Sequence, residues 1–364
     1  MIINISSVEF QQIFDDERLY LPIRWNGNDF ISTLDALYHT YQYQIEKSIN
    51  GGHNNICKNV EECCSIIIKA VKAYLNGFPS DAFIQIERLM CILMQNPLKV
   101  YQKSIRELFD YSNQIDPLDL FRVVVVNDNI PYGRSRVFHT PYTLRSKVST
   151  SRYSIAGYPS LYLGTSIELC QEELRLNPYD KLSITSLFKI ERNIEYNNTE
   201  INVIELAVKP QDFFEERNRF EYNKRYISYN NLNYNKVRNA YLLWYPLIAA
   251  CSFIRTNKSD PFAVEYIVPQ LLMQWVRREI NTNEIDYDKL IGIRYFSCAS
   301  IKASQMGFNY VFPTSGKQYD INFPYCSVLV KAFRLTKPVY IHDFNSTKDC
   351  ENYLRKQDLD NVTY

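Results

Sequence analysis

Glycine is scarce in this chain, with only 10 among 364 residues. No set of these glycines forms a G-x-G-x-x-G or G-x-x-x-x-G-K arrangement, the spacings with which glycine-rich turns approach dinucleotides and nucleotide phosphates. The sequence therefore argues against a glycine-fingerprint dinucleotide site and against a P-loop.

An excess of charge of one sign is also absent. The chain carries 41 Lys and Arg against 40 Asp and Glu, which gives a net charge of +1. A protein with this balance has no general electrostatic attraction to nucleic acid or to an anionic membrane, although a local basic groove is compatible with it. Nucleic acid and membranes are therefore not expected among its partners.

Long hydrophobic runs are missing as well. The longest, residues 241–254, is interrupted by Pro246 and Ser252 and is too short to span a bilayer, so we expect a buried helix there. The first ten residues contain no basic residue and no continuous apolar stretch, unlike a signal peptide. The nine cysteines are odd in number and lie mostly in apolar segments. Together these features predict a protein of the reducing cytoplasm.

Histidine is rare, with four residues, and the chain has no C-x-x-C, H-x-x-x-H or H-E-x-x-H spacing. These are the patterns that bring nitrogen and sulfur ligands to zinc, so no metal site is expected.

The first part of the chain has a helical pattern. Apolar residues over 60–75 recur at the spacing of one helix face, Gly77 stands where a helix often ends, and Ser80 can cap a following helix. No cluster of polar side chains accompanies these stripes. We therefore expect residues 1–115 to form a helical accessory module with a structural or partner-binding role.

The character of the sequence changes after Pro117. The run LFRVVVV at 120–126 predicts a buried strand, and Thr165 with Glu168 forms a candidate capping box for a helix over 166–176. The remaining expected elements are strands at 159–163, 185–190, 201–207, 308–312 and 327–333 and helical segments at 246–254 and 268–278. Irregular alternation of strands and helices predicts an α+β fold over 116–313, with 314–364 as a C-terminal extension packed on it.

One segment, residues 222–236, is rich in Asn and Tyr and carries three basic residues. The simpler interpretation is a polar loop, which we favour. The alternative is an aromatic and basic surface that contacts nucleic acid or a nucleotide.

Three stretches stand apart from an ordinary α+β sequence. The first, 138–174, contains Arg152, then Tyr162 ten residues later, then Glu173 eleven residues after that. A strand, turn and helix in succession can bring these three side chains close together. The other two stretches are DPFAVEYIVPQLLMQW at 260–275 and GIRYFS at 292–297.

These stretches resemble the RES domain family, which is named after its Arg, Glu and Ser. The resemblance covers roughly 120–313, and the order and spacing of the motifs carry it. The family's G-R-W/F-N/S…G…Y pattern corresponds to Arg152, Tyr153, Ser154, Gly157 and Tyr162, and its helix-borne Glu to Glu173. Its E-Y-x-x-P-Q segment corresponds to Glu265, Tyr266, Pro269 and Gln270, and its G-I-x-Y-x-S segment to Gly292, Ile293, Tyr295 and Ser297.

The chain departs from the family pattern at three places. Ser151 precedes the arginine where the family has glycine, and Tyr153 replaces the tryptophan. Glu172 lies beside Glu173 and could be the working carboxylate instead, although the spacing favours Glu173.

The resemblance implies an ADP-ribosyltransferase-like mixed sheet and a site that uses NAD as a substrate, with no further cofactor. Breaking the nicotinamide–ribose bond creates positive charge on the sugar, which a carboxylate such as Glu173 can stabilise. The implied partners of this carboxylate are Arg152 for a phosphate or ribose oxygen, Tyr162 for stacking on nicotinamide, and Ser297 for the carboxamide or a ribose hydroxyl. Candidate substrate-binding residues are Arg122, His139, Arg145, Tyr153 and Gln270, and for His139 a structural role is an open alternative.

The resulting hypothesis is an NAD-degrading enzyme that transfers ADP-ribose to water or phosphate, in the setting of a bacterial toxin or defence effector. One alternative is an ADP-ribosyltransferase that modifies a macromolecule. Another is a non-catalytic protein that binds a partner or senses a nucleotide. The resemblance also implies an antitoxin or other regulatory partner, and the sequence leaves a homo-oligomer open.

Overall fold

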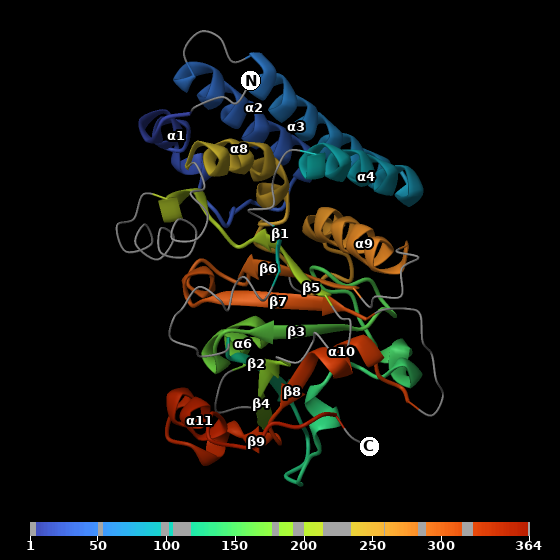
Figure 1. Ribbon diagram of the computed structural model, residues 1–364. Coiled ribbons are helices and arrows are strands. Elements are labelled where there is room, and N and C mark those ends of the chain that lie inside the picture. The colour runs from blue at the N-terminus through green and yellow to red at the C-terminus, as the bar shows by residue number, and fades with distance from the viewer. Residues whose placement is uncertain are drawn as a thin grey trace. The chain divides into compact units, whose positions relative to one another are not determined.

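The computed structural model describes residues 5–49, 54–95, 102–104, 118–176, 182–191, 200–213, 234–257, 259–282, 289–314 and 323–362 (Figure 1). The chain divides into two compact units. The helical unit comprises Met1–Gln102 and Val208–Trp275, and the sheet unit comprises Lys103–Ala207 and Val276–Tyr364.

The helical unit is built around a buried helix. Its helices are α1 (Ser7–Ile13), α2 (Phe30–Ser48), α3 (Asn54–Leu75), α4 (Pro79–Gln95), α8 (Tyr234–Ala250) and the first part of α9 (Ile267–Thr282), with short 3-10 turns η1 (Glu17–Leu19), η6 (Pro210–Phe213) and η7 (Val264–Tyr266). Between Ala240 and Cys251 every residue of α8 and its end is buried. The predicted helix end at Gly77 is confirmed, because Gly77 adopts a φ of +86° directly after α3.

Helix α8 contains a proline, and the unit compensates for it. Pro246 has no N–H, so the carbonyl of Leu242 one turn earlier loses its usual helical partner. The Tyr41 hydroxyl donates to this carbonyl at 2.8 Å. The Tyr38 hydroxyl donates to the carbonyl of Pro246 itself, also at 2.8 Å. Helix α2 thereby satisfies backbone groups of α8, and the two segments, 200 residues apart in sequence, belong to one core.

This core changes the predicted domain boundaries. We expected 1–115 to be helical on its own and 116–313 to be one catalytic domain, yet 208–275 belongs with the N-terminal helices. The reason is the all-round apolar character of α8, which a single sheet face cannot cover. The rings of Tyr241 and Tyr245 on α8 contact the Phe14 ring at centroid distances of 5.8 and 5.0 Å.

The sheet unit confirms the α+β prediction. Among the described residues its sheet has nine strands in the order β1-β5-β6-β7-β3-β2-β4-β8, with β9 paired to β4. The strands are β1 (Gln102–Ser104), β2 (Leu120–Val125), β3 (Ser160–Gly164), β4 (Ser183–Ile190), β5 (Glu200–Leu206), β6 (Lys289–Phe296), β7 (Phe308–Pro313), β8 (Phe333–Leu335) and β9 (Val339–Tyr340). The pair β5–β6 is parallel, and the pairs β2–β3, β2–β4, β3–β7, β4–β8, β4–β9 and β6–β7 are antiparallel.

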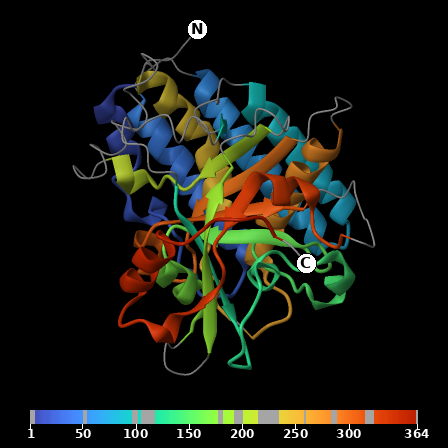
Figure 2. The same cartoon turned by 60° about the horizontal axis from the view of Figure 1, so that its bottom comes forward.

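Short helices complete the sheet unit. They are α6 (Ile167–Leu174), α10 (Ser327–Ala332) and α11 (Thr347–Leu354), with 3-10 turns η3 (Arg134–Val137), η4 (Tyr142–Lys147), η8 (Ala303–Gln305) and η9 (Ile341–Asp343). Helices α6 and α11, green and red in the ribbon, lie side by side in both views (Figures 1 and 2).

Several local expectations are corrected. The predicted strand at 327–333 is helix α10 followed by β8, and GIRYF at 292–296 belongs to strand β6, which we did not predict. The N-cap of α6 is Ser166, whose hydroxyl accepts from Leu169 N–H at 3.1 Å, while Thr165 accepts from Phe308 N–H instead. The segment 222–236 lies outside the described residues except for its last three, which begin α8.

The C-terminal part of the chain is integral to the sheet. Strands β8 and β9 both pair with β4, so the segment after 314 contributes to the sheet as well as packing on it. Among the helices of the described residues, none combines the length and the apolar character that a bilayer-spanning segment needs.

Candidate functional site

A tight turn presents Arg152 and Tyr153 beside strand β3. Ser151 and Ser154 exchange backbone hydrogen bonds across it at 3.0 and 3.2 Å. Their hydroxyls lie 2.7 and 2.8 Å from the Tyr162 hydroxyl on β3. Tyr162 therefore fastens this turn to the sheet through its hydroxyl, a role that the sequence did not suggest.

Tyr295, on β6, is influenced electrostatically by several of the predicted site residues. Burial raises the pKa of Tyr295 well above its usual value, and the nearby groups of Glu173, Tyr162 and Tyr153 raise it further while Arg152 lowers it. The rings of Tyr153 and Tyr295 are 4.7 Å apart. Side chains from the turn, β3 and α6 thus act electrostatically on this one phenol of β6. Tyr295 was part of a matched motif but not a candidate site residue.

Glu173 connects this cluster to strand β7. Its Oε1 accepts a hydrogen bond from Asn309 Nδ2 at 2.5 Å, and the remainder of the side chain is exposed. Its neighbour Glu172 instead pairs with Lys302 at 3.2 Å. The Glu173 carboxylate also raises the pKa of the buried Tyr295. This geometry favours Glu173 over Glu172 as the working carboxylate, and Asn309 is a site residue that sequence reasoning missed.

Arg122 on β2 carries an unsatisfied buried nitrogen. Among the described residues, its Nη1 is buried and finds no hydrogen-bond acceptor. Burial lowers the pKa of Arg122 to about 10, and the neighbouring Cys170 and Tyr162 partly oppose this effect. An unpaired buried guanidinium nitrogen is costly, so this position suits an anionic group. Tyr162 is thus one of the groups that act electrostatically on Arg122.

Arg145 belongs to a different group of side chains. Its guanidinium lies 4.9 Å from the Tyr142 ring centroid and 5.9 Å from that of Tyr158. Arg277 lies over the same Tyr158 ring at 4.7 Å and donates to the Thr314 carbonyl at 2.7 Å. Arg145 thus engages in cation–π contacts, and no described contact joins it to Glu173.

Ser297 is fully buried just after β6. Its Oγ accepts from Ala299 N–H at 3.1 Å, which stabilises the turn that follows the strand. This local contact gives the side chain a structural role; the substrate contact that the resemblance implies remains a prediction.

Gln270 and the matched Glu265 lie in the helical unit. Glu265 is buried, and its Oε1 accepts from Trp25 Nε1 at 3.1 Å and from Thr256 N–H at 3.2 Å. This carboxylate therefore anchors segments of the helical unit to one another. Gln270 lies on α9, in the part of that helix that belongs to the helical unit.

His139 is held on both sides of its ring. Cys326 N–H donates to Nε2 at 2.9 Å, which requires that the proton be on Nδ1, and Nδ1 donates to the Thr140 carbonyl at 2.8 Å. The residue is fully buried, and burial lowers the pKa of His139 to about 4. The geometry favours the structural alternative for His139 over direct substrate binding.

This histidine predicts acid sensitivity. The unfolded chain binds a proton near the ordinary pKa of 6.5 and the folded chain near 4. The neutral ring therefore contributes stability that is complete above pH 6.5 and is lost as pH falls towards 4. We expect the free energy of unfolding to fall by about 2 kcal/mol between pH 7.5 and pH 5 from this group. Urea unfolding at both pH values measures it.

His139→Gln is the control for this experiment, because a glutamine amide can donate and accept but does not titrate. The fall between pH 7.5 and pH 5 should be smaller in this variant by the same amount. Equal pH dependence of the two proteins would contradict the assignment of a neutral buried ring.

The described residues contain no group of three or more His, Cys, Asp or Glu side chains that could hold a metal ion. The cluster itself offers Glu173, two arginines, three tyrosines, two serine hydroxyls and Asn309. Such a set can hold an anion, contact an aromatic ring and stabilise a developing positive charge.

Over 340 residues the chain is 28% identical to a curated protein of Bacillus subtilis (strain 168) named "Putative toxin YopC". The alignment covers 90% of this chain and 70% of that protein, so it includes both units. No protein-family model and no solved structure matches the chain.

Proposed function

We propose that the sheet unit cleaves the nicotinamide–ribose bond of NAD and transfers ADP-ribose to water or phosphate. The observation that carries this proposal is a series of contacts that links the predicted catalytic side chains. The serine hydroxyls on either side of Arg152 contact the Tyr162 hydroxyl. The Tyr153 ring packs on Tyr295, and Tyr295 is paired in the sheet with Asn309, which donates to Glu173. Arg152, Tyr162 and Glu173 were chosen for the order and spacing of motifs that resemble the RES domain family, and the contacts that link them support a common site.

The proposed chemistry assigns one task to each side chain. As the bond between ribose C1 and the nicotinamide nitrogen breaks, its electron pair leaves with nicotinamide, which departs neutral. The Glu173 carboxylate holds a ribose hydroxyl and stabilises the positive charge that develops on the sugar. Water or phosphate then bonds to C1; with water, its proton is released to solvent.

The two arginines suit the pyrophosphate. Arg122 has a buried Nη1 without an acceptor, which a phosphate oxygen would satisfy. Arg152 is almost fully buried in the turn whose serine hydroxyls contact Tyr162, and we assign its guanidinium to a phosphate or ribose oxygen. The hydrogen bond from Asn309 orients Glu173 without neutralising it.

The relative's name supports a toxin-like role for this chain. NAD loss arrests metabolism, so an NAD-degrading activity is a direct physical route to growth arrest. We propose a bacterial toxin or defence effector, which implies a regulatory protein that restrains it.

The test is incubation of the purified full-length protein with NAD, with free nicotinamide and ADP-ribose separated by chromatography. We expect nicotinamide release in proportion to enzyme, with ADP-ribose in water and its phosphate ester when phosphate is added. Label from adenine-labelled NAD that remains on macromolecules would instead support transfer to a macromolecule. Absence of nicotinamide release by folded protein would overturn the proposal.

A further inference from the structure

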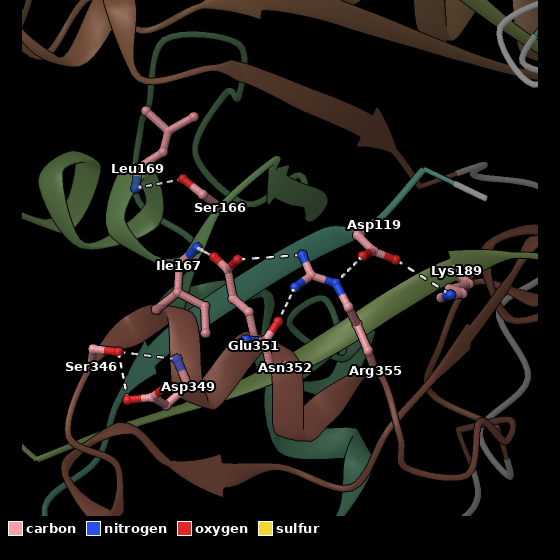
Figure 3. A network of polar contacts seen from close by, with 10 residues as sticks. All are labelled: Asp119, Ser166, Ile167, Leu169, Lys189, Ser346, Asp349, Glu351, Asn352 and Arg355. Carbon is pink, nitrogen blue, oxygen red and sulfur yellow. Dashed lines mark hydrogen bonds and ion pairs between the residues drawn. The ribbon is translucent and has the colours of Figure 1, made fainter. Parts of the chain in front are cut away.

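The helix that carries Glu173 is short and begins under a carboxylate from the C-terminal segment. Helix α6 spans only Ile167–Leu174, and isolated helices of that length are not stable in water. Its position therefore depends on its ends and on its packing. At its N-terminus, Ser166 accepts from Leu169 N–H, and Glu351 Oε1 accepts from Ile167 N–H at 2.9 Å (Figure 3).

Glu351 is well placed for this contact. Its side chain is only 14% exposed, so water competes little with Ile167 N–H for the carboxylate oxygen. The N-terminus of a helix has unsatisfied N–H groups and a positive dipole end, both of which favour a carboxylate. Glu351 lies 184 residues away from Ile167 in sequence. Nothing in the local pattern of either segment predicts the contact.

The carboxylate is itself held in position. Arg355, the residue that directly follows α11, lies 3.4 Å from Glu351 Oε2 and donates to Asp119 Oδ2 at 2.6 Å (Figure 3). Asp119 in turn lies 3.4 Å from Lys189 at the end of β4. The network thus connects α11 to the start of β2 and to the end of β4. Helix α11 presents Glu351 to α6 from a fixed support.

Packing reinforces this arrangement. The inner face of α11 contributes Cys350 and Leu354 to the hydrophobic cluster that contains Ile167, Phe121 and Leu187. The N-terminus of α11 is closed by Ser346, whose hydroxyl accepts from Asp349 N–H at 3.1 Å. The first residue of α6 is therefore both packed against α11 and hydrogen-bonded to it.

We propose that Glu351 is a positioning residue for the site: by anchoring the first turn of α6, it holds Glu173 in register with Asn309 and Tyr295. This inference rests on the proposed function for its catalytic consequence, although the anchoring itself does not. Glu351 lies at the start of α6 and Glu173 near its end, so it acts through the helix and contacts no reacting group.

The test compares Glu351→Ala with Glu351→Gln, which retains an oxygen that can accept from Ile167 N–H. Lys348→Ala is the matched control, because Lys348 is exposed on the same helix. Amide hydrogen exchange by mass spectrometry reports on 160–176, and NAD turnover gives kcat and KM. Circular dichroism and thermal unfolding establish that each variant is folded at the assay temperature.

We expect Glu351→Ala to speed exchange in α6 roughly 10-fold, the effect of losing one helix cap. We also expect its kcat to fall by about 10- to 100-fold with little change in KM, because misplaced catalytic groups lose rate before affinity. Glu351→Gln should recover most of both, and Lys348→Ala should match the parent protein.

Unchanged exchange in α6 of Glu351→Ala would overturn the proposal whatever the activity. Faster exchange with an unchanged kcat would overturn the positioning role. If the parent protein releases no nicotinamide, the NAD proposal fails by itself, and the exchange of α6 still decides whether Glu351 anchors this helix.

Discussion

Replacing Glu173 by glutamine is expected to lower the kcat for the proposed NAD cleavage by about 100- to 1000-fold, the loss that follows when one preorganised electrostatic contact to the transition state is removed. The amide keeps the size of the side chain but cannot stabilise positive charge on the ribose. Because Glu173 is exposed apart from its contact with Asn309, the thermal unfolding temperature should change little. Nicotinamide release under saturating NAD measures the effect.

Glu172→Gln is the matched control, because it makes the same change one residue earlier. Glu172 pairs with Lys302 at the surface, and exposed pairs of this kind contribute roughly 0–1 kcal/mol. Its turnover should therefore equal that of the parent protein. If Glu172→Gln were the inactive variant and Glu173→Gln the active one, the assignment of the carboxylate would be reversed.

Replacing Arg294 by methionine is expected to lower the free energy of unfolding by about 3–5 kcal/mol, because it removes the positive charge that faces the buried Glu205 carboxylate. The two side chains are only 7% and 5% exposed, with Arg294 Nη1 and Glu205 Oε2 2.5 Å apart. They face each other in the register of the parallel strands β5 and β6. The Arg294 guanidinium also lies 3.9 Å from the Phe308 ring centroid, so it is fixed on a second side. Urea unfolding measures the change.

The double variant Glu205→Gln/Arg294→Met separates the lost pair from the unpaired charge. We expect it to recover more than half of the stability lost by Arg294→Met alone, because no ionised group is then buried without a partner. Lys302→Met breaks an exposed pair and should cost no more than about 1 kcal/mol. An Arg294→Met protein as stable as Lys302→Met would contradict the burial of this ion pair.

Local pattern predicted the elements that a local pattern can encode. The apolar residues that recur over 60–75 lie on helix α3, and Gly77 lies just beyond its end. The run of β-branched residues at 120–125 forms strand β2. The prediction of a strand at 327–333 was wrong because a short apolar run suits a buried strand and a buried helix equally. In the structure, α10 occupies most of this range and precedes the three residues of β8.

The predicted domain boundaries differ from the two observed units for another reason. Residues 208–275 leave the sheet after β5 and return at β6, which is the next strand in the sheet and runs parallel to β5. A parallel neighbour requires a long connection, and here that connection includes α8. Nothing in the sequence of 208–275 distinguishes a crossover from a helix that completes the core of the N-terminal helices.

The sequence by itself determined the α+β class, most helices and strands, and the order in which Arg152, Tyr162 and Glu173 occur, because periodicity and spacing are properties of neighbouring residues. The tertiary structure alone decided which groups these side chains meet. Asn309 reaches Glu173 across 136 residues and Glu351 reaches Ile167 across 184. Such contacts depend on strand order and helix docking, so they exist only once the sheet has assembled.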